Sequence, residues 1–157
     1  MFPTRILVAT DGSEEAIPAL EAAAELADGT GSELHVVHVV STKLELPYPS
    51  VTARERTDAL LEQRRLGGMR ILERHGRFIE ELGGHVSASH YKEGTPEKEV
   101  LEVGDQIGAG LIVTGGRRRP WFERIFGRGF STTLLQRANR PVLVVNKQGQ
   151  RSSTVPR

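Results

Sequence analysis

The chain has 157 residues, of which 26% are charged and 38% hydrophobic, and its formal net charge is +1 at pH 7. This length fits one domain with its own core, and the near-zero charge means that binding to nucleic acid or membrane would need a local basic patch. The absence of cysteine excludes disulfides, thiolate metal sites and a cysteine nucleophile.

The sequence contains no recognisable metal motif and no membrane segment. Its five histidines are His35, His38, His75, His85 and His90. None has the spacing of a known metal motif, and the first two, three apart in an expected strand, should point to opposite faces. No apolar run reaches the roughly 20 residues of a membrane helix, and the chain enters its first strand without a signal peptide. We therefore expect a cytoplasmic protein with no membrane partner.

The first half of the chain predicts two strands and two helices. Residues 6–9 form a short apolar strand that ends in a turn. An alanine-rich helix follows, in which Pro18 lies slightly deep for the first turn and either delays the start or kinks the helix. Residues 33–40 are a second strand, and 41–53 are expected to be irregular. A helix is expected over 54–82, where Gly67, Gly68 and Gly76 either soften it or permit close packing on a neighbour.

The second half continues the alternation. Residues 86–91 form a polar strand suited to a sheet edge, and Thr95 and Pro96 open a helix as N-cap and first helical residue. Apolar strands are expected at 111–114 and 141–145, separated by a loop and a short helix over about 130–137. Residues 1–147 thus form one α/β domain, and the polar residues 148–157 are expected to be a disordered tail. Continuous apolar strands that alternate with helices are typical of a parallel sheet covered on both faces.

Two loops are expected to form a ligand site. In open α/β sheets, ligands bind outside the carboxyl ends of the strands where the strand order reverses. If the strands at 6–9 and 111–114 flank that point, the loops that follow them converge near helix N-termini, which favour anions. The second loop is rich in residues that approach or bind phosphate: Gly115, Gly116, Gly127, Gly129, Arg117, Arg118, Arg119, Arg124 and Arg128. The alternative is a solvated loop whose arginines pair with surface acids such as Glu123.

Common catalytic motifs are absent from the sequence. There is no phosphate-binding G-x-x-x-x-G-K-[ST], no complete dinucleotide fingerprint and no G-x-S-x-G. Asp11, His38 and Ser131 could be combined into a triad, but this is one free choice among many residues.

The chain resembles the universal stress protein family along nearly its whole length. The similar segments are Ile6 to Ser13 with the alanine-rich helix after it, Leu34 to Val40, Glu93 to Pro96, Leu111 to Gly115, and Ala138 to Val145. Each segment is modest alone, but their order and spacing together match the family. The resemblance implies a single-domain, Rossmann-like five-stranded parallel sheet in the order 3-2-1-4-5, with helices on both faces. It also implies a homodimer made through the last strand.

The family has ATP-binding and non-ATP-binding members, and the binders carry G-x2-G-x9-G-[ST] after the fourth strand. Those four positions here are Gly115, Arg118, Arg128 and Gly129, of which only the first matches. Ser131 matches a serine often found two residues beyond the motif. Asp11 resembles the acid on the adenine side and Val39 the apolar residue against the base. The adenine half therefore resembles the family and the phosphate half does not.

The resemblance implies ATP or another adenine nucleotide as the ligand, with Mg²⁺ accompanying it, and no catalytic or metal-binding residue of the protein. The candidate nucleotide-binding residues are Thr10, Asp11, Gly12, Ser13, Val39, Thr114, Gly115, Arg117, Arg118, Arg128, Gly129, Phe130 and Ser131. The candidate dimer residues are Val142, Leu143, Val144 and Val145.

Four functions are consistent with these observations. The first is a non-catalytic, adenine-nucleotide-binding homodimer of the stress response. The second is a dimer without an ATP site that acts through protein contacts. The third is a nucleotide-hydrolysing or nucleotide-transferring enzyme, disfavoured because the arginine-rich loop offers only Glu123 as an acid. The fourth is a single-strand nucleic-acid binder, which would use the aromatic residues among the arginines; anchoring of the loop to the core explains those rings more simply.

Overall fold

The computed structural model describes residues 2–42, 51–116 and 129–146. Within them, five parallel strands form one sheet in the order β3-β2-β1-β4-β5. The strands are β1 (Arg5–Ala9), β2 (Glu33–Ser41), β3 (Val86–Gly94), β4 (Leu111–Gly115) and β5 (Val142–Val145). The helices are the 3₁₀ turn η1 (Glu14–Ala16), α1 (Ile17–Thr30), α2 (Val51–Glu81), α3 (Pro96–Ile107) and α5 (Phe130–Arg137). The predicted fold class and strand order are confirmed.

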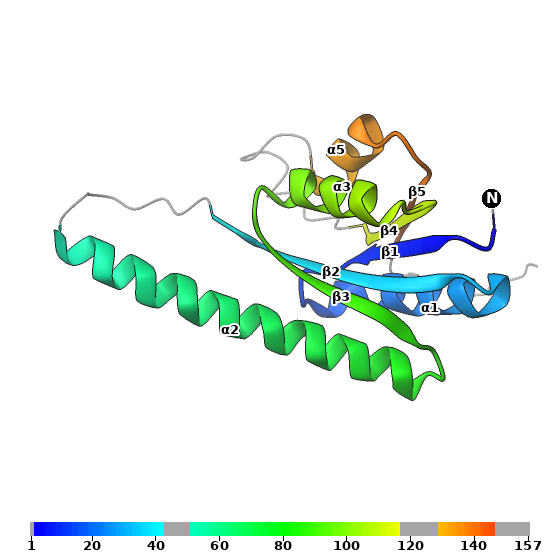
Figure 1. Cartoon of the computed structure of the whole chain (residues 1–157), viewed down its shortest axis with the longest axis horizontal. Helices are drawn as coiled ribbons and strands as arrows, with labels where there is room; N and C mark the ends of the chain where they lie inside the picture. Colours follow the sequence, from blue (N-terminus) through cyan, green and yellow to red (C-terminus); the bar gives the residue numbers. More distant parts are fainter. Residues whose placement is uncertain (1, 43–50, 117–128, 147–157) are drawn as a thin grey trace, which may run out of the picture.

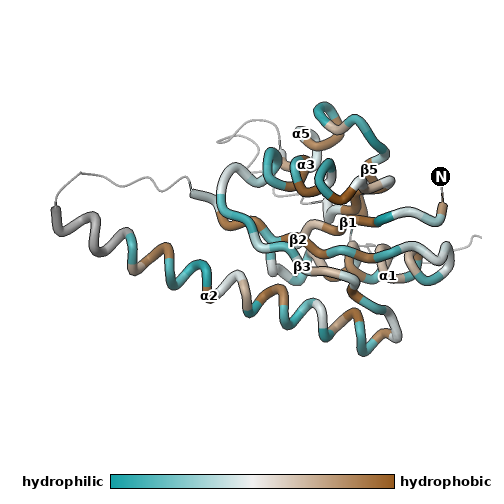
Figure 2. The backbone as a smooth tube through the Cα atoms, in the orientation of Figure 1, coloured by the Kyte–Doolittle hydropathy of each residue, from teal (hydrophilic) through white to brown (hydrophobic). Residues whose placement is uncertain are grey.

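Helices cover both faces of the sheet, with α1 and α2 on one side and α3 and α5 on the other (Figure 1). Side chains alternate between the faces along each strand. In β1, Ile6 and Val8 join the core under α1 and α2, whereas Leu7 and Ala9 join the core under α3 and α5. Both faces of the sheet are therefore apolar. In Figure 2, hydrophobic and hydrophilic stretches alternate along α2, as expected for a helix with one buried side.

The structure corrects several predicted boundaries. Helix α2 begins at Val51, inside the segment predicted to be irregular, and β3 continues to Gly94 rather than ending at Tyr91. Of the two alternatives for Pro18, a delayed start or a kink, the structure shows the delayed start: η1 precedes α1, and Pro18 lies in the first turn of α1. Thr95 occupies the predicted N-cap position before Pro96, although its side chain makes no capping hydrogen bond.

The glycines of α2 differ in their surroundings. A Cβ at Gly68 would lie 2.6 Å from Cε2 of Tyr91 and 3.1 Å from Cδ2 of His38, whereas a Cβ at Gly67 or Gly76 would meet no atom within 4 Å. The close-packing interpretation is therefore correct for Gly68, which lets α2 approach the sheet.

Helix α2 is longer than the sheet it covers. Its 31 residues span about 46 Å, and its N-terminal end extends past the carboxyl ends of the strands (Figure 1). No helix among the described residues has the length and apolar composition needed to cross a membrane.

The predicted tail at 148–157 lies outside the described residues, so the division into a domain at 1–147 and a disordered tail stays a prediction.

Candidate functional site

The loops after β1 and β4 meet at the carboxyl edge of the sheet. The two strands are hydrogen-bonded neighbours, with Ala9 paired to Thr114, and the strand order reverses between them. Ser131, in the first turn of α5, donates its hydroxyl to the Gly115 carbonyl at 3.1 Å. The structure thus brings the β1 turn (residues 10–13), the end of β4 (residues 114–116) and the start of α5 (residues 129–131) to one edge, as predicted.

Among the other candidate residues, Val39 lies within the described part of the chain and three arginines do not. Val39 is half-buried in β2 and packs against the core under α3 and α5. The candidates Arg117, Arg118 and Arg128 lie outside the described residues, so their part in a site stays a prediction.

The β1 turn is closed by hydrogen bonds between its own residues. The Gly12 amide donates to Thr10 Oγ1 at 3.1 Å, and the Ser13 amide and hydroxyl donate to Asp11 Oδ1 at 2.9 and 2.5 Å. Gly12 has a φ of +82°, a backbone conformation that disfavours side chains. The turn therefore presents the exposed Asp11 carboxylate at the edge of the sheet.

Thr10 lies beneath the turn and is 5% exposed. Its amide donates to the Val37 carbonyl at 3.0 Å, and its own carbonyl accepts a hydrogen bond from Nδ1 of His38 at 2.8 Å. Its hydroxyl lies 2.8 Å from Nδ1 of His75. Thr10 therefore supports the turn from below, because its polar groups are engaged with the protein.

His75 and the contact between His38 and Thr10 are not among the features predicted from the sequence. A signal for His75 exists, since it continues the buried stripe of Leu72 and Ile79 along α2. A polar residue on such a stripe needs a buried partner. Only the folded structure shows that this partner is Thr10.

Burial lowers the pKa of both histidines, because it disfavours the charged imidazolium. For His38, the hydrogen bond to the Thr10 carbonyl partly opposes this effect on the pKa. For His75, the positive charge of Arg74, and that of His38 when it is protonated, lower the pKa further. Both side chains are therefore neutral at pH 7.

Two glycines, Gly115 and Gly116, stand at the end of β4. A Cβ at Gly115 would lie 3.0 Å from the Glu15 carbonyl oxygen of η1, so the glycine permits close approach of these backbones. The Gly116 amide donates to the Val145 carbonyl at 2.9 Å, which ties the loop to β5. Thr114 is 3% exposed and lies in the sheet behind them. This part of the site offers backbone groups, the Ser131 side chain and the N-terminus of α5.

The hypothetical triad of Asp11, His38 and Ser131 is not assembled. Nδ1 of His38 donates to the Thr10 carbonyl, and the Ser131 hydroxyl donates to the Gly115 carbonyl. The described residues also contain no group of three histidine or acidic side chains that could hold a metal ion.

Comparisons with known proteins agree on one family. The model of the universal stress protein family matches residues 3–146. The chain is 30% identical over 145 residues to universal stress protein YxiE of Bacillus subtilis, covering 90% of this chain and 97% of the relative. It is 28% identical over 143 residues to universal stress protein MJ0531 of Methanocaldococcus jannaschii, covering 91% and 82%.

Solved structures share the fold. Universal stress protein UspA from Lactobacillus plantarum superimposes with a TM-score of 0.76 at 19% identity, over 92% of this chain and 99% of the other. A universal stress protein from Archaeoglobus fulgidus, solved in complex with dAMP, matches with a TM-score of 0.61 at 22% identity, over 92% and 98%. Another universal stress protein was solved in complex with cAMP and matches with a TM-score of 0.68 at 18% identity, over 94% and 100%.

Proposed function

The chain belongs to the universal stress protein family, and on that premise we propose that it binds an adenine nucleotide at the carboxyl edge of its sheet without converting it. The observation that carries this proposal is the meeting of the β1 turn with the end of β4 and the start of α5, joined by the bond from Ser131 to Gly115. Ligands bind at such a switch point in open α/β sheets.

The choice of an adenine nucleotide is supported by relatives of the same fold. Two universal stress proteins were solved with adenine nucleotides, one with dAMP and one with cAMP. In this chain, we assign Asp11 and Val39 to the adenosine half of the ligand. Gly115, Ser131 and the N-terminus of α5 would receive the phosphates, because free amides at a helix start favour anions.

The proposal has two forms, which differ in the role of the arginines at the phosphate half of the site. As ligands, Arg118 and Arg128 would each add a charge-assisted hydrogen bond to phosphate. As replacements for the family's motif glycines, they would instead fill the space that the phosphates need. We favour retained binding with altered phosphate contacts, because five arginines lie between residues 117 and 128, next to the Gly115 loop.

Two measurements test the proposal. Mass spectrometry of the natively purified protein would detect a co-purified nucleotide, and calorimetry with ATP, ADP and AMP, with and without Mg²⁺, would measure affinity. We expect Asp11→Ala to weaken binding at least several-fold and the control Glu80→Ala, on an exposed position of α2, to leave it unchanged.

Further variants separate the alternatives. If Arg118→Ala and Arg128→Ala each weaken binding, the arginines act as ligands. If changing both to glycine strengthens binding, their side chains fill the space that the phosphates need. No nucleotide bound by any variant would refute the proposal and favour a module that acts through protein contacts. Rapid ATP hydrolysis that Asp11→Ala abolishes would refute the non-catalytic part.

The same proposal includes a homodimer made through β5. This strand lies at the edge of the sheet, and Leu143 is 37% exposed on it. An uncovered apolar edge invites aggregation, and a two-fold partner strand would cover it. We expect sedimentation at micromolar concentration to give a dimer that Leu143→Glu weakens and that the control Leu82→Glu, 52% exposed after α2, does not. A monomeric unmodified protein would contradict this part.

A further inference from the structure

The β1 turn is held by a hydrogen-bonded chain that runs from α2 to the Gly12 amide. Thr10 Oγ1 lies 2.8 Å from Nδ1 of His75 and accepts the Gly12 amide at 3.1 Å. His75 is 2% exposed and Thr10 is 5% exposed, so water does not compete for these bonds. One imidazole of α2 thus connects to the backbone of the turn that carries Asp11.

The positions of the protons in these hydrogen bonds follow from which atoms can donate and which can accept. The Gly12 N–H can only donate, so Thr10 Oγ1 accepts from it. The Thr10 hydroxyl proton then needs an acceptor, and Nδ1 of His75 lies at hydrogen-bond distance, 2.8 Å from Oγ1. The arrangement therefore assigns a neutral His75 with its own proton on Nε2. A second proton, on Nδ1, would turn this nitrogen from an acceptor into a donor. The Thr10 hydroxyl proton would then lose its acceptor, and the bond that joins α2 to the turn would have to rearrange.

Helix α2 contacts the same turn at two further points. Arg74 Nη2 donates to the Gly12 carbonyl at 3.1 Å. A Cβ at Gly12 would lie 2.6 Å from Cδ1 of Ile71, which shows how closely the helix covers the turn. Residues 71–75 of α2 therefore form a clamp on the β1 turn, and His75 is its buried member.

We propose that His75 is a positioning residue of the nucleotide site. In its neutral form it accepts a hydrogen bond from the Thr10 hydroxyl and holds the β1 turn, and protonation of its ring releases the turn and weakens ligand binding. The ligand part of this inference rests on the proposed function. The positioning part concerns only contacts within the chain, so it can be measured without a ligand.

The surroundings of His75 oppose its protonation. Burial is the main cause that lowers its pKa; the positive charge of Arg74 on its own helix, and that of His38 on β2 when protonated, lower the pKa further. The β1 turn contributes the carboxylate of Asp11, one residue beyond Thr10. Helix α2 packs against β2, β3 and α1. Besides His38, the titratable residues of these elements are Glu33, His35, His90, Tyr91, Lys92, Glu93, Glu21, Glu25 and Asp28. Protonation is thus expected only under acidic conditions, below the ordinary histidine value of about 6.5.

Calorimetry with AMP at pH 8 and pH 5 tests the inference in three proteins. In His75→Asn, the amide oxygen can take the place of Nδ1 as an acceptor but does not titrate. We expect this variant to bind within about twofold of the unmodified protein at pH 8 and to lose less affinity at pH 5. His75→Leu, which has no acceptor, should bind about fivefold more weakly at both pH values, the effect of one lost hydrogen bond. Titration of the AMP phosphate is common to all three and cancels in the comparison.

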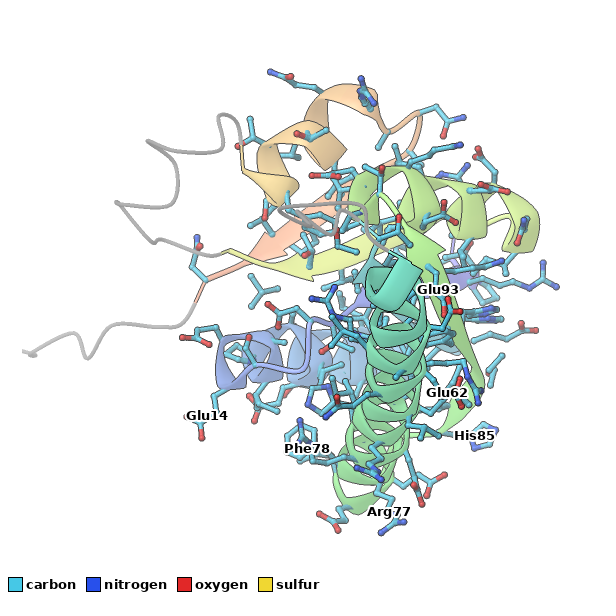
Figure 3. The ribbon with its side chains drawn as sticks, turned by 90° about the vertical axis from the view of Figure 1, so that its left-hand side faces the viewer. Glu14, Glu62, Arg77, Phe78, His85 and Glu93 are labelled. Carbon is cyan, nitrogen blue, oxygen red and sulfur yellow. The ribbon has the colours of Figure 1, made fainter. Side chains whose placement is uncertain are left out.

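A ligand-free measurement separates this inference from the proposed function. In the nucleotide-free protein, the NMR resonance of the Gly12 amide should shift along the titration of the His75 ring, and this dependence should vanish in His75→Asn. The control His85→Asn, at an exposed histidine on the periphery (Figure 3), should change neither the NMR titration nor AMP binding.

The outcomes are distinct. If the chemical shift of the Gly12 amide does not change as His75 titrates, the inference is overturned, whether or not AMP binds. A shift without any AMP binding supports the positioning role and refutes the proposed function. Equal loss of AMP affinity at pH 5 in the unmodified protein and in His75→Asn overturns the link to binding. If His75→Leu does not fold, the Asn variant and the NMR titration still decide.

Discussion

The two halves of the candidate site are built differently. The β1 turn is held by side chains of other elements: the buried His75 and His38 bond to Thr10, and the exposed Arg74 bonds to Gly12. The end of β4 is held mainly by backbone, with the Gly116 amide on Val145 and one bond from Ser131. The first half therefore has a conformation set by the core, whereas the second has fewer side-chain bonds among the described residues.

This difference bears on where the site can change. A turn that depends on buried partners tolerates few substitutions, because each exchange leaves a partner unsatisfied. A backbone-lined loop tolerates other side chains as long as the glycines at close approaches remain. In sequence, the β1 turn resembles the family, whereas the phosphate loop departs from its motif at Arg118, Arg128 and Gly129. The following predictions test the contrast.

Loss of the Thr10 hydroxyl should have the largest effect. Thr10→Val keeps the shape of the side chain but leaves His75 Nδ1 and the Gly12 amide without this partner. We expect the free energy of unfolding to fall by about 2–3 kcal/mol, measured by urea denaturation. Ser131→Ala removes the corresponding bond of the other half, which is only partly buried, and should cost about 1 kcal/mol or less. Equal losses would contradict the contrast.

The close approach of α2 to the sheet provides the next test. Gly68→Ala places a methyl group against the Tyr91 ring and should destabilise the protein by about 1–3 kcal/mol through overpacking. The matched control is its neighbour. Gly67→Ala adds a methyl group in open space and should stabilise the helix by up to about 1 kcal/mol. Thermal unfolding of the two variants should therefore shift in opposite directions.

Glycine substitutions compare the two loops directly. Gly12→Ala combines a φ of +82° with a contact to Ile71, and we expect a loss of about 1–2 kcal/mol in the free energy of unfolding. Gly116→Ala meets mainly the end of the exposed Asn146 side chain, which can move, so its loss should be smaller. Gly31→Ala, with a φ of +66° and no atom near the added Cβ, isolates the conformational cost. If Gly12→Ala lowers the free energy of unfolding no more than Gly31→Ala does, α2 does not pack closely on the β1 turn.

Acidification should have the mildest effect. The folded state lowers the pKa of His38 and His75, mainly through burial. The unfolded chain therefore binds more protons as the pH falls below about 6.5, and the stability that is complete above that pH is progressively lost. In urea denaturation between pH 8 and pH 5, the double variant His38→Asn/His75→Asn should lose less stability than the unmodified protein. The single variant His85→Asn, at an exposed residue, should behave like the unmodified protein.

Much of the architecture was predictable from local pattern. Apolar runs bounded by turn residues located the strands, because buried parallel strands need apolar side chains on both faces. The boundaries at Val51 and Gly94 were not predictable in this way. The segment before Arg54 contains prolines that suggest a loop, and the end of β3 is polar because it lies at an edge, so neither has the apolar signature of a core element.

By itself, the sequence determined the fold class, the strand order through its family resemblance, and the turn at Thr10 to Ser13, since these depend on local composition and on spacing along the chain. It did not determine the partners of Thr10, because His38 and His75 lie 28 and 65 residues away. Nor did it decide between softness and close packing at Gly68, whose neighbours Tyr91 and His38 come from two other elements. Only the tertiary structure decided these points, because the role of a buried polar group or of a glycine depends on the residues that the fold packs against it.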